Sequence, residues 1–178
     1  MSAAIEETVA APPELEGLFL AHHVRALKVA YRITGSMPDA EDVAQAVFLR
    51  ILQQGACRQA IQHPESYVYR AAVNAALDLL RKRRRERAVP VEEAEGAGDR
   101  IDAERDCQAR ELRAWLRQAL TTLDPRAAEI FVLRYLEGYD NRQIARMLNT
   151  SRAVVAVVLH RARARLRNHF RTYMRGAK

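Results

Sequence analysis

Arginine is the residue whose type and spacing say most about the chemistry of this chain. Five arginines follow closely on one another near the C-terminus: Arg161, Arg163, Arg165, Arg167 and Arg171. A second basic run occupies residues 81–85. Guanidinium groups neutralise phosphates and release their counterions, and the chain as a whole has a net charge of +7. The pattern predicts a polyanion partner, most simply nucleic acid. A solvated basic surface without a partner is the alternative.

The segment 139–166 has the layout of a helix-turn-helix. Asn149 can adopt the left-handed conformation that a tight turn requires, and Ser151 can cap the helix that follows. Apolar residues recur at helical spacing on both sides of this turn: Ile144, Ala145 and Leu148 before it, and Val155, Leu159, Ala162 and Leu166 after it. In this motif the second helix enters the major groove of DNA. A plain helical hairpin would show the same spacing, but the basic tail favours DNA.

The sequence contains no recognisable catalytic or metal-binding set. Its histidines are scattered, neither Cys57 nor Cys107 has a neighbouring base, and no phosphate loop or paired-carboxylate motif occurs. We therefore expect no enzymatic activity, no metal and no cofactor. The cysteines give no disulfide framework, which suits a reduced, cytoplasmic protein. No stretch approaches the roughly 20 apolar residues of a membrane helix, and the N-terminus lacks secretory features.

Hydrophobic periodicity predicts an all-α protein of two small helical domains joined by a flexible acidic linker. Helices are expected at 14–34, 39–54, 64–87, 104–121, 125–136, 140–148 and 151–174. Gly35 should end the first helix, and Asp39 should cap the second. The domains are expected at 14–88 and 107–178, after a disordered tail at 1–13. Residues 88–103 lose helical periodicity, and the acid-rich residues 89–106 are expected to form the linker.

Apolar residues at helical spacing also predict which faces of the first three helices are buried. The expected sets are Leu15, Leu18, Phe19, Val24, Leu27 and Tyr31 in the first helix, Val43, Val47, Phe48 and Ile51 in the second, and Tyr67, Val68, Ala71, Ala72, Ala75 and Leu79 in the third.

Four motifs in order make the chain resemble an extracytoplasmic-function (ECF) sigma factor of bacterial RNA polymerase. They are an acidic helix start at 39–50, a promoter-melting helix from Tyr67, an approach segment at 123–138 and a helix end at 160–166. The resemblance implies a subunit that binds core RNA polymerase, through its β′ clamp and β flap, and gives it promoter choice. The first domain would recognise and melt the −10 element, and the second would contact the −35 element.

The resemblance assigns three surfaces to residues of this chain. Polymerase docking is expected at Asp39, Glu41, Asp42, Gln45 and Phe48. Contact with −10 DNA is expected at Tyr67, Tyr69, Asn74, Asp78, Arg81, Lys82, Arg83 and Arg84. Contact with −35 DNA is expected at Arg142, Ser151, Arg152, Ala153, Ala156, Val157, His160, Arg161 and Arg163. The −10 set makes chemical sense, because Asn can hydrogen-bond base edges, Tyr can stack on unpaired bases and a basic run can follow a backbone.

Several of these assignments have a structural alternative. Tyr67 can pack in the core instead, and Asp78 can simply pair with Arg81 or Lys82 as a helical neighbour. The acids at the start of the second helix also suit the helix dipole. In the family, the loop before the melting helix, here about 53–63, reads an extruded −10 base. The family's linker runs near the RNA exit path, and an acidic linker would suit a positively charged channel or serve only as a tether.

The sequence departs from the family in two helices. Ala46 stands where the family usually has Glu, which predicts a weaker clamp contact. Val154, Ala156, Val157 and Val158 occupy positions that commonly carry Thr, Lys, Ser and Arg on the recognition helix. Aliphatic groups can contact thymine methyls but cannot hydrogen-bond phosphates, so −35 recognition would rely on the flanking basic residues. Alternatively, these valines bury against another protein, such as an anti-sigma factor.

A stand-alone helix-turn-helix regulator is the alternative function. It would need to dimerise, because one helix-turn-helix reads only a short half-site, and the sequence offers no evident dimerisation helix or ligand domain. It would also leave the tyrosines and asparagine of residues 64–87 unexplained. Duplex binding without polymerase would distinguish the two.

Overall fold

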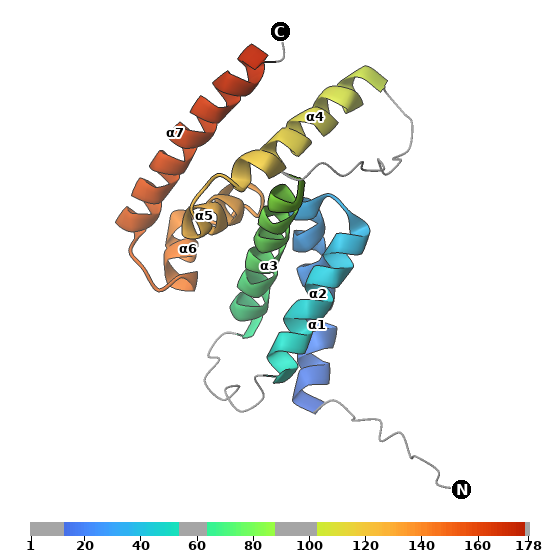
Figure 1. Cartoon of the computed structure of the whole chain (residues 1–178). Helices are drawn as coiled ribbons and strands as arrows, with labels where there is room; N and C mark the ends of the chain where they lie inside the picture. Colours follow the sequence, from blue (N-terminus) through green and yellow to red (C-terminus); the bar gives the residue numbers. More distant parts are fainter. Residues whose placement is uncertain (1–12, 54–63, 88–102, 177–178) are drawn as a thin grey trace, which may run out of the picture.

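The computed structural model describes residues 13–53, 64–87 and 103–176 (Figure 1). Every regular element in these ranges is an α-helix, as predicted: α1 (Pro13–Thr34), α2 (Met37–Gln53), α3 (Pro64–Arg87), α4 (Ala103–Leu120), α5 (Pro125–Tyr135), α6 (Asn141–Met147) and α7 (Arg152–Gly176). No helix of this described part is long and apolar enough for a membrane span. The predicted tail, most of the predicted linker and the loop before α3 lie outside the described residues.

The helices α1, α2 and α3 pack against one another in a bundle (blue to green in Figure 1). On α2 the predicted buried set is confirmed, since Val43, Val47, Phe48 and Ile51 all lie in the core. On α1 the prediction is wrong for Phe19, Val24 and Tyr31, which are exposed, whereas Leu27 is partly buried against the core. The side chains of Leu15 and Leu18 lie outside the described residues. The α1 residues that are buried are Ala26, Val29, Ala30 and Ile33. Two alanines on this face let the neighbouring helices approach closely. The close packing therefore buries this face of α1 and leaves the face with the bulkier side chains exposed.

The buried face of α3 differs from the predicted one in a similar way. Val68 and Ala72 are buried as expected, but Tyr69, Val73 and Leu77 complete the face. The other predicted residues of this face are only partly buried against the core: Tyr67, Ala71, Ala75 and Leu79. Helical periodicity was compatible with both the predicted and the observed buried face, because the apolar residues of α3 cover more than one side of the helix.

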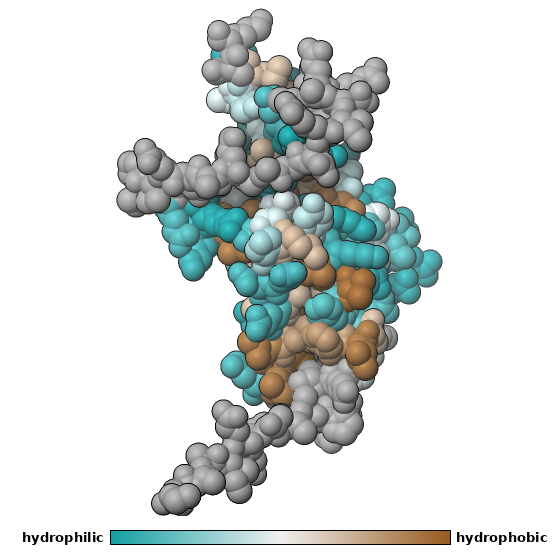
Figure 2. Space-filling view, turned by 90° about the vertical axis from the view of Figure 1, so that its right-hand side faces the viewer, coloured by the Kyte–Doolittle hydropathy of each residue, from teal (hydrophilic) through white to brown (hydrophobic). Residues whose placement is uncertain are grey.

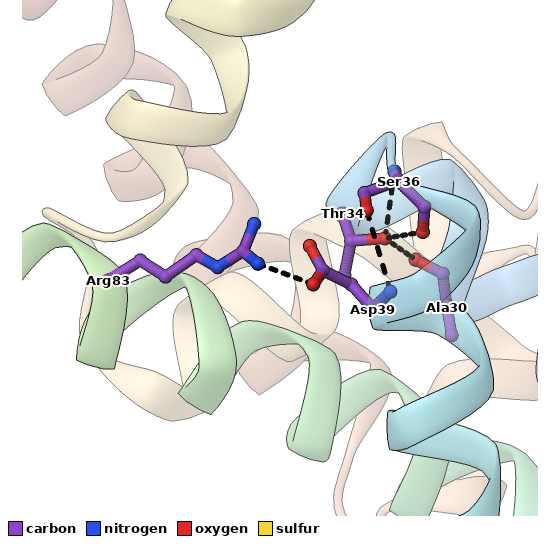
Figure 3. Close-up of polar contacts among 5 residues, drawn as sticks. All are labelled: Ala30, Thr34, Ser36, Asp39 and Arg83. Atoms are coloured by element: carbon purple, nitrogen blue, oxygen red, sulfur yellow. Dashed lines mark hydrogen bonds and ion pairs between the residues drawn. The ribbon is translucent and has the colours of Figure 1, made fainter. Parts of the chain in front are cut away.

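The turn between α1 and α2 is closed by local hydrogen bonds. Gly35 adopts a φ of 72°, and its N–H donates to the Tyr31 carbonyl at 2.7 Å. The N–H of Asp39 donates to Ser36 Oγ at 3.4 Å (Figure 3). Ser36 is therefore the capping residue of α2, and the prediction that Asp39 caps it is wrong. Asp39 already lies within the helix, so its own N–H needs the acceptor that Ser36 supplies.

The second half of the described chain consists of α4, α5, α6 and α7. These helices pack against one another around a shared interior. Asp124 caps α5 by accepting from the Arg126 N–H at 3.0 Å, and Pro125 occupies the first helical position. On α4, the Trp115 ring packs edge-on against Phe170 of α7, with ring centres 5.0 Å apart.

The buried residues of both halves form one continuous cluster. Helix α3 lies between the first bundle and α5 (Figure 1). The helix α4 also approaches the α1–α2 turn, where a Cβ added to Gly35 would lie 2.5 Å from Arg117 Nη1. In this structure the two predicted domains are thus packed together.

Replacing Ile130 by Ala tests the position of this core. Ile130 is fully buried on α5, so the Ile130→Ala cavity should lower the free energy of unfolding by about 2–5 kcal/mol. Urea denaturation followed by circular dichroism measures the loss. The control is Leu20→Ala, at a side chain that is 71% exposed, which should change the value by at most about 0.5 kcal/mol. Equal losses in both variants would contradict the assignment.

Candidate nucleic-acid interface

The turn of the helix-turn-helix has the local chemistry that the sequence predicts. Asn149 adopts a φ of 47°, and Ser151 Oγ accepts from the Val154 N–H at 3.2 Å at the start of α7. Both predictions are confirmed. The preceding helix α6 is held by a reciprocal capping box between Asp140 and Gln143. The N–H of Gln143, together with that of Arg142, lowers the pKa of Asp140.

The two helices of the motif share a buried side and leave one face of α7 open. The predicted buried set is confirmed for Ile144, Ala145, Val155, Leu159, Ala162 and Leu166, while Leu148 is only partly buried against the core. The residues assigned to −35 DNA are all exposed: Arg142, Ser151, Arg152, Ala153, Ala156, Val157, His160, Arg161 and Arg163. Val158 is half-buried and packs on the core, so it does not belong to the open face as predicted. The open face therefore combines aliphatic groups with a basic C-terminal end.

The α3 residues assigned to −10 DNA lie in a different environment. Tyr69 is only 3% exposed and meets Tyr139 edge-on, with ring centres 5.7 Å apart. The guanidinium carbon of Arg25 lies 4.9 Å from the centre of the Tyr69 ring. Burial raises the pKa of the Tyr69 phenol far above its ordinary value, and the neighbouring Glu137 carboxylate adds to the rise. In this arrangement Tyr69 is a core residue, so the prediction that it faces unpaired bases does not hold here.

Asn74 is also engaged within the chain. Its Nδ2 donates to Glu129 Oε1 of α5 at 3.2 Å. The same oxygen accepts from Arg70 Nε at 2.9 Å, and Arg70 Nη1 donates to the Met147 carbonyl at 3.0 Å. Sequence reasoning missed Arg70. The available signal was its position four residues before Asn74, which places both side chains on one side of α3.

Several basic side chains at the end of α3 each contact a different partner. Arg81 pairs with Asp78 at 2.8 Å, which confirms the helical-neighbour alternative for Asp78, while Lys82 lies 3.8 Å from Glu86. Arg84 Nη1 donates to Thr121 Oγ1 at 3.1 Å. Beside these residues lies a cavity of about 340 Å³ lined by Arg70, Asn74, Asp78, Arg81, Pro125, Arg126, Glu129 and Leu148.

Two of the five residues assigned to polymerase docking are buried. Asp39 accepts from Arg83 of α3 at 2.5 Å (Figure 3), and Phe48 packs edge-on against Phe19 at 4.9 Å between ring centres. Both therefore hold the first bundle together instead of presenting a surface. The other three, Glu41, Asp42 and Gln45, are exposed on α2. Exposed apolar side chains of α1 and α2 contribute to the brown area in Figure 2.

Comparison with known proteins identifies the family to which this chain belongs. The sigma-70 region 2 family matches residues 18–86, and the family "Sigma-70, region 4" matches residues 113–166. The ECF RNA polymerase sigma factor SigM of Mycobacterium tuberculosis H37Rv is 30% identical over 84% of this chain and 73% of SigM. The chain belongs to the ECF sigma factors. The first match ends within one residue of the end of α3, and the second contains the whole helix-turn-helix.

Two further likenesses extend this result. The ECF sigma factor SigE of Mycolicibacterium smegmatis is 30% identical over 90% of this sigma factor, which spans 63% of the length of SigE. The solved sigma factor RpoE of Bartonella quintana, in complex with the anti-sigma factor NepR, shares the fold with a TM-score of 0.52. It is 17% identical and is covered over 98% of its length, against 90% of this chain.

Substitution of Asn149 tests the turn. A β-branched residue in the left-handed region costs roughly 1–2 kcal/mol, so Asn149→Val should lower the free energy of unfolding by about that amount. Asn149→Gly is the matched variant and should leave it nearly unchanged, because glycine adopts this φ readily. Urea denaturation of the full chain measures both. A turn that tolerates valine as well as glycine would contradict the role given to the φ of Asn149.

Proposed function

We propose that this sigma factor is a promoter-specificity subunit, which binds core RNA polymerase, recognises −10 and −35 elements, melts the −10 DNA and initiates transcription. The observation that carries the proposal is the order of the two matches, region 2 before region 4, in one chain. Such a subunit opens DNA with binding energy, so we propose no enzymatic activity. Its place of action would be the cytoplasm, with the polymerase.

The role proposed for α7 is contact with the −35 element. Arg152 at its start and Arg161 and Arg163 further along are exposed and can neutralise phosphates on both sides of a groove. Between them, Ala153, Ala156 and Val157 present only methyl groups, which can meet thymine methyls. We therefore expect −35 binding with a strong backbone component and little base specificity.

The role proposed for α2 is docking on the β′ clamp of the polymerase. Glu41, Asp42 and Gln45 supply exposed polar groups, and Leu49 and Leu52 supply exposed apolar surface on the same helix. An interface of this kind combines an apolar centre with a polar rim. The β flap is proposed as the contact of the second half.

An anti-sigma factor is a further proposed partner. Support comes from the related fold of RpoE, which was solved with its anti-sigma factor NepR. It also comes from Val154 and Val157, two exposed valines one turn apart on α7. These valines could contact thymine methyls of DNA or the surface of another protein. A charged substitution is expected to have opposite effects in the two cases.

In vitro transcription with purified bacterial core polymerase and a library of genomic fragments tests the function. We expect discrete start sites that share an upstream sequence, with a weak −35 consensus because of the aliphatic face of α7. Tight duplex binding by the protein alone, without specific transcripts, would contradict the proposal and favour a stand-alone regulator.

Substitution Val157→Lys tests which partner α7 meets. Val157 is 49% exposed, so a lysine there should add a phosphate contact, tighten −35 duplex binding and steepen the salt dependence by about one counterion. Fluorescence anisotropy of the polymerase-bound protein across a salt series measures both. Val24→Lys on α1, also exposed, is the matched control and should change neither. Unchanged −35 binding in Val157→Lys would contradict groove placement of this face.

A further inference from the structure

We propose that Glu129 acts as an intrachain latch, which holds the DNA-melting helix α3 against the second half and keeps the free sigma factor closed. The latch consists of the Glu129 carboxylate with Arg70 and Asn74, and the closed arrangement is the packing of α5 and the α5–α6 segment on α3. The inference rests on the proposed function, because it assigns a regulatory state to the −10 surface.

The latch takes up the donors that nucleic acid would need. Glu129 Oε1 accepts from Arg70 at 2.9 Å and from Asn74 at 3.2 Å. A guanidinium and an amide are also the groups that bind phosphates and base edges. A carboxylate is an anion with hydrogen-bond acceptors, so it competes for these donors in the way that a phosphate or a base acceptor would.

Other contacts extend the closed arrangement along α1 and α3. Arg32 of α1 donates to Glu137, which follows α5, at 2.7 Å. Arg25 of α1 donates to the Tyr139 hydroxyl, and the Tyr139 ring covers Tyr69. At the far end of α3, Arg84 reaches Thr121. Cations of the first half thus meet acceptors of the second half at several points.

The position of Glu129 in its own helix supports a contact that can open. Its side chain is only 7% exposed, and its neighbours Ala128 and Ile130 are fully buried. A buried carboxylate without a partner is costly, so the pairing with α3 satisfies it in the closed arrangement. When the halves separate, water can solvate the same charge. An apolar residue at this position would favour permanent packing.

The distance between the two halves tests the latch directly. In a Cys57→Ser, Cys107→Ser background, spin labels at Arg50→Cys in α2 and Asn168→Cys in α7, both exposed positions outside the proposed contact sets, report the separation by electron–electron double resonance. We expect one short, narrow distance in the parent chain. Glu129→Gln removes the charge and should add a longer, broader population. Circular dichroism checks that the helices are retained.

The matched control is Glu86→Gln. It removes the same charge from the basic end of α3, where Glu86 is exposed and pairs only loosely with Lys82. It should leave the distance unchanged. Raising the salt from about 0.1 M to about 1 M shortens the Debye length from about 10 Å to about 3 Å and should open the parent chain without any substitution in α5. An unchanged distance in Glu129→Gln and at high salt would overturn the latch.

Binding of a single-stranded oligonucleotide with the −10 sequence found by transcription gives the second measurement. Glu129→Gln should tighten binding by about fivefold or more, the lower end of ordinary coupling between sites, and Glu86→Gln should not. Equal tightening in both variants would assign the effect to charge alone and overturn the latch. Opening of Glu129→Gln without promoter-specific transcription by the parent chain would support the latch while contradicting the proposed function.

Discussion

Helix α3 has two faces that both need partners, and the arrangement of the whole chain follows from this constraint. Its apolar face, with Val68, Val73 and Leu77, completes the first bundle. Its polar face carries Arg70 and Asn74, whose donors are satisfied by the Glu129 carboxylate of α5. Because buried or half-buried donors are costly to leave unpaired, the closed arrangement depends on Glu129, and separation of the halves leaves these donors to water or to another acceptor. Promoter DNA offers acceptors of the same chemistry.

The two proposed DNA surfaces therefore differ in whether they are accessible to DNA in this arrangement. The open face of α7 requires no rearrangement, since its basic and aliphatic side chains are already exposed on a helix held by the Asn149 turn. The α3 surface is covered, with Tyr69 packed beneath Tyr139. A sigma factor built in this way would meet duplex DNA through α7 first and expose α3 only when the halves separate.

Most local chemistry was predictable from the sequence, and so was the buried face of α2, whereas the buried faces of α1 and α3 were only partly predictable. The bounds of α3, the left-handed Asn149 and the Ser151 cap all depend on neighbouring residues and were predicted correctly. The burial of Tyr69 depends on Tyr139, and the partner of Arg70 lies 59 residues away. Such contacts are decided by tertiary packing, which periodicity in one helix does not contain. The burial of Asp39, which the sequence placed on a docking surface, likewise involves a distant partner, because its carboxylate accepts from Arg83, 44 residues away.

In the closed arrangement proposed here, this sigma factor has to open when it binds its polymerase and promoter. The most direct test is the α2–α7 distance in the spin-labelled parent chain, measured before and after addition of core polymerase and promoter DNA. The account predicts a short distance in the free protein and a longer one in the complex, with the change complete at saturating polymerase. The same short distance in a complex that transcribes would contradict it, because α3 could then melt DNA while covered by α5.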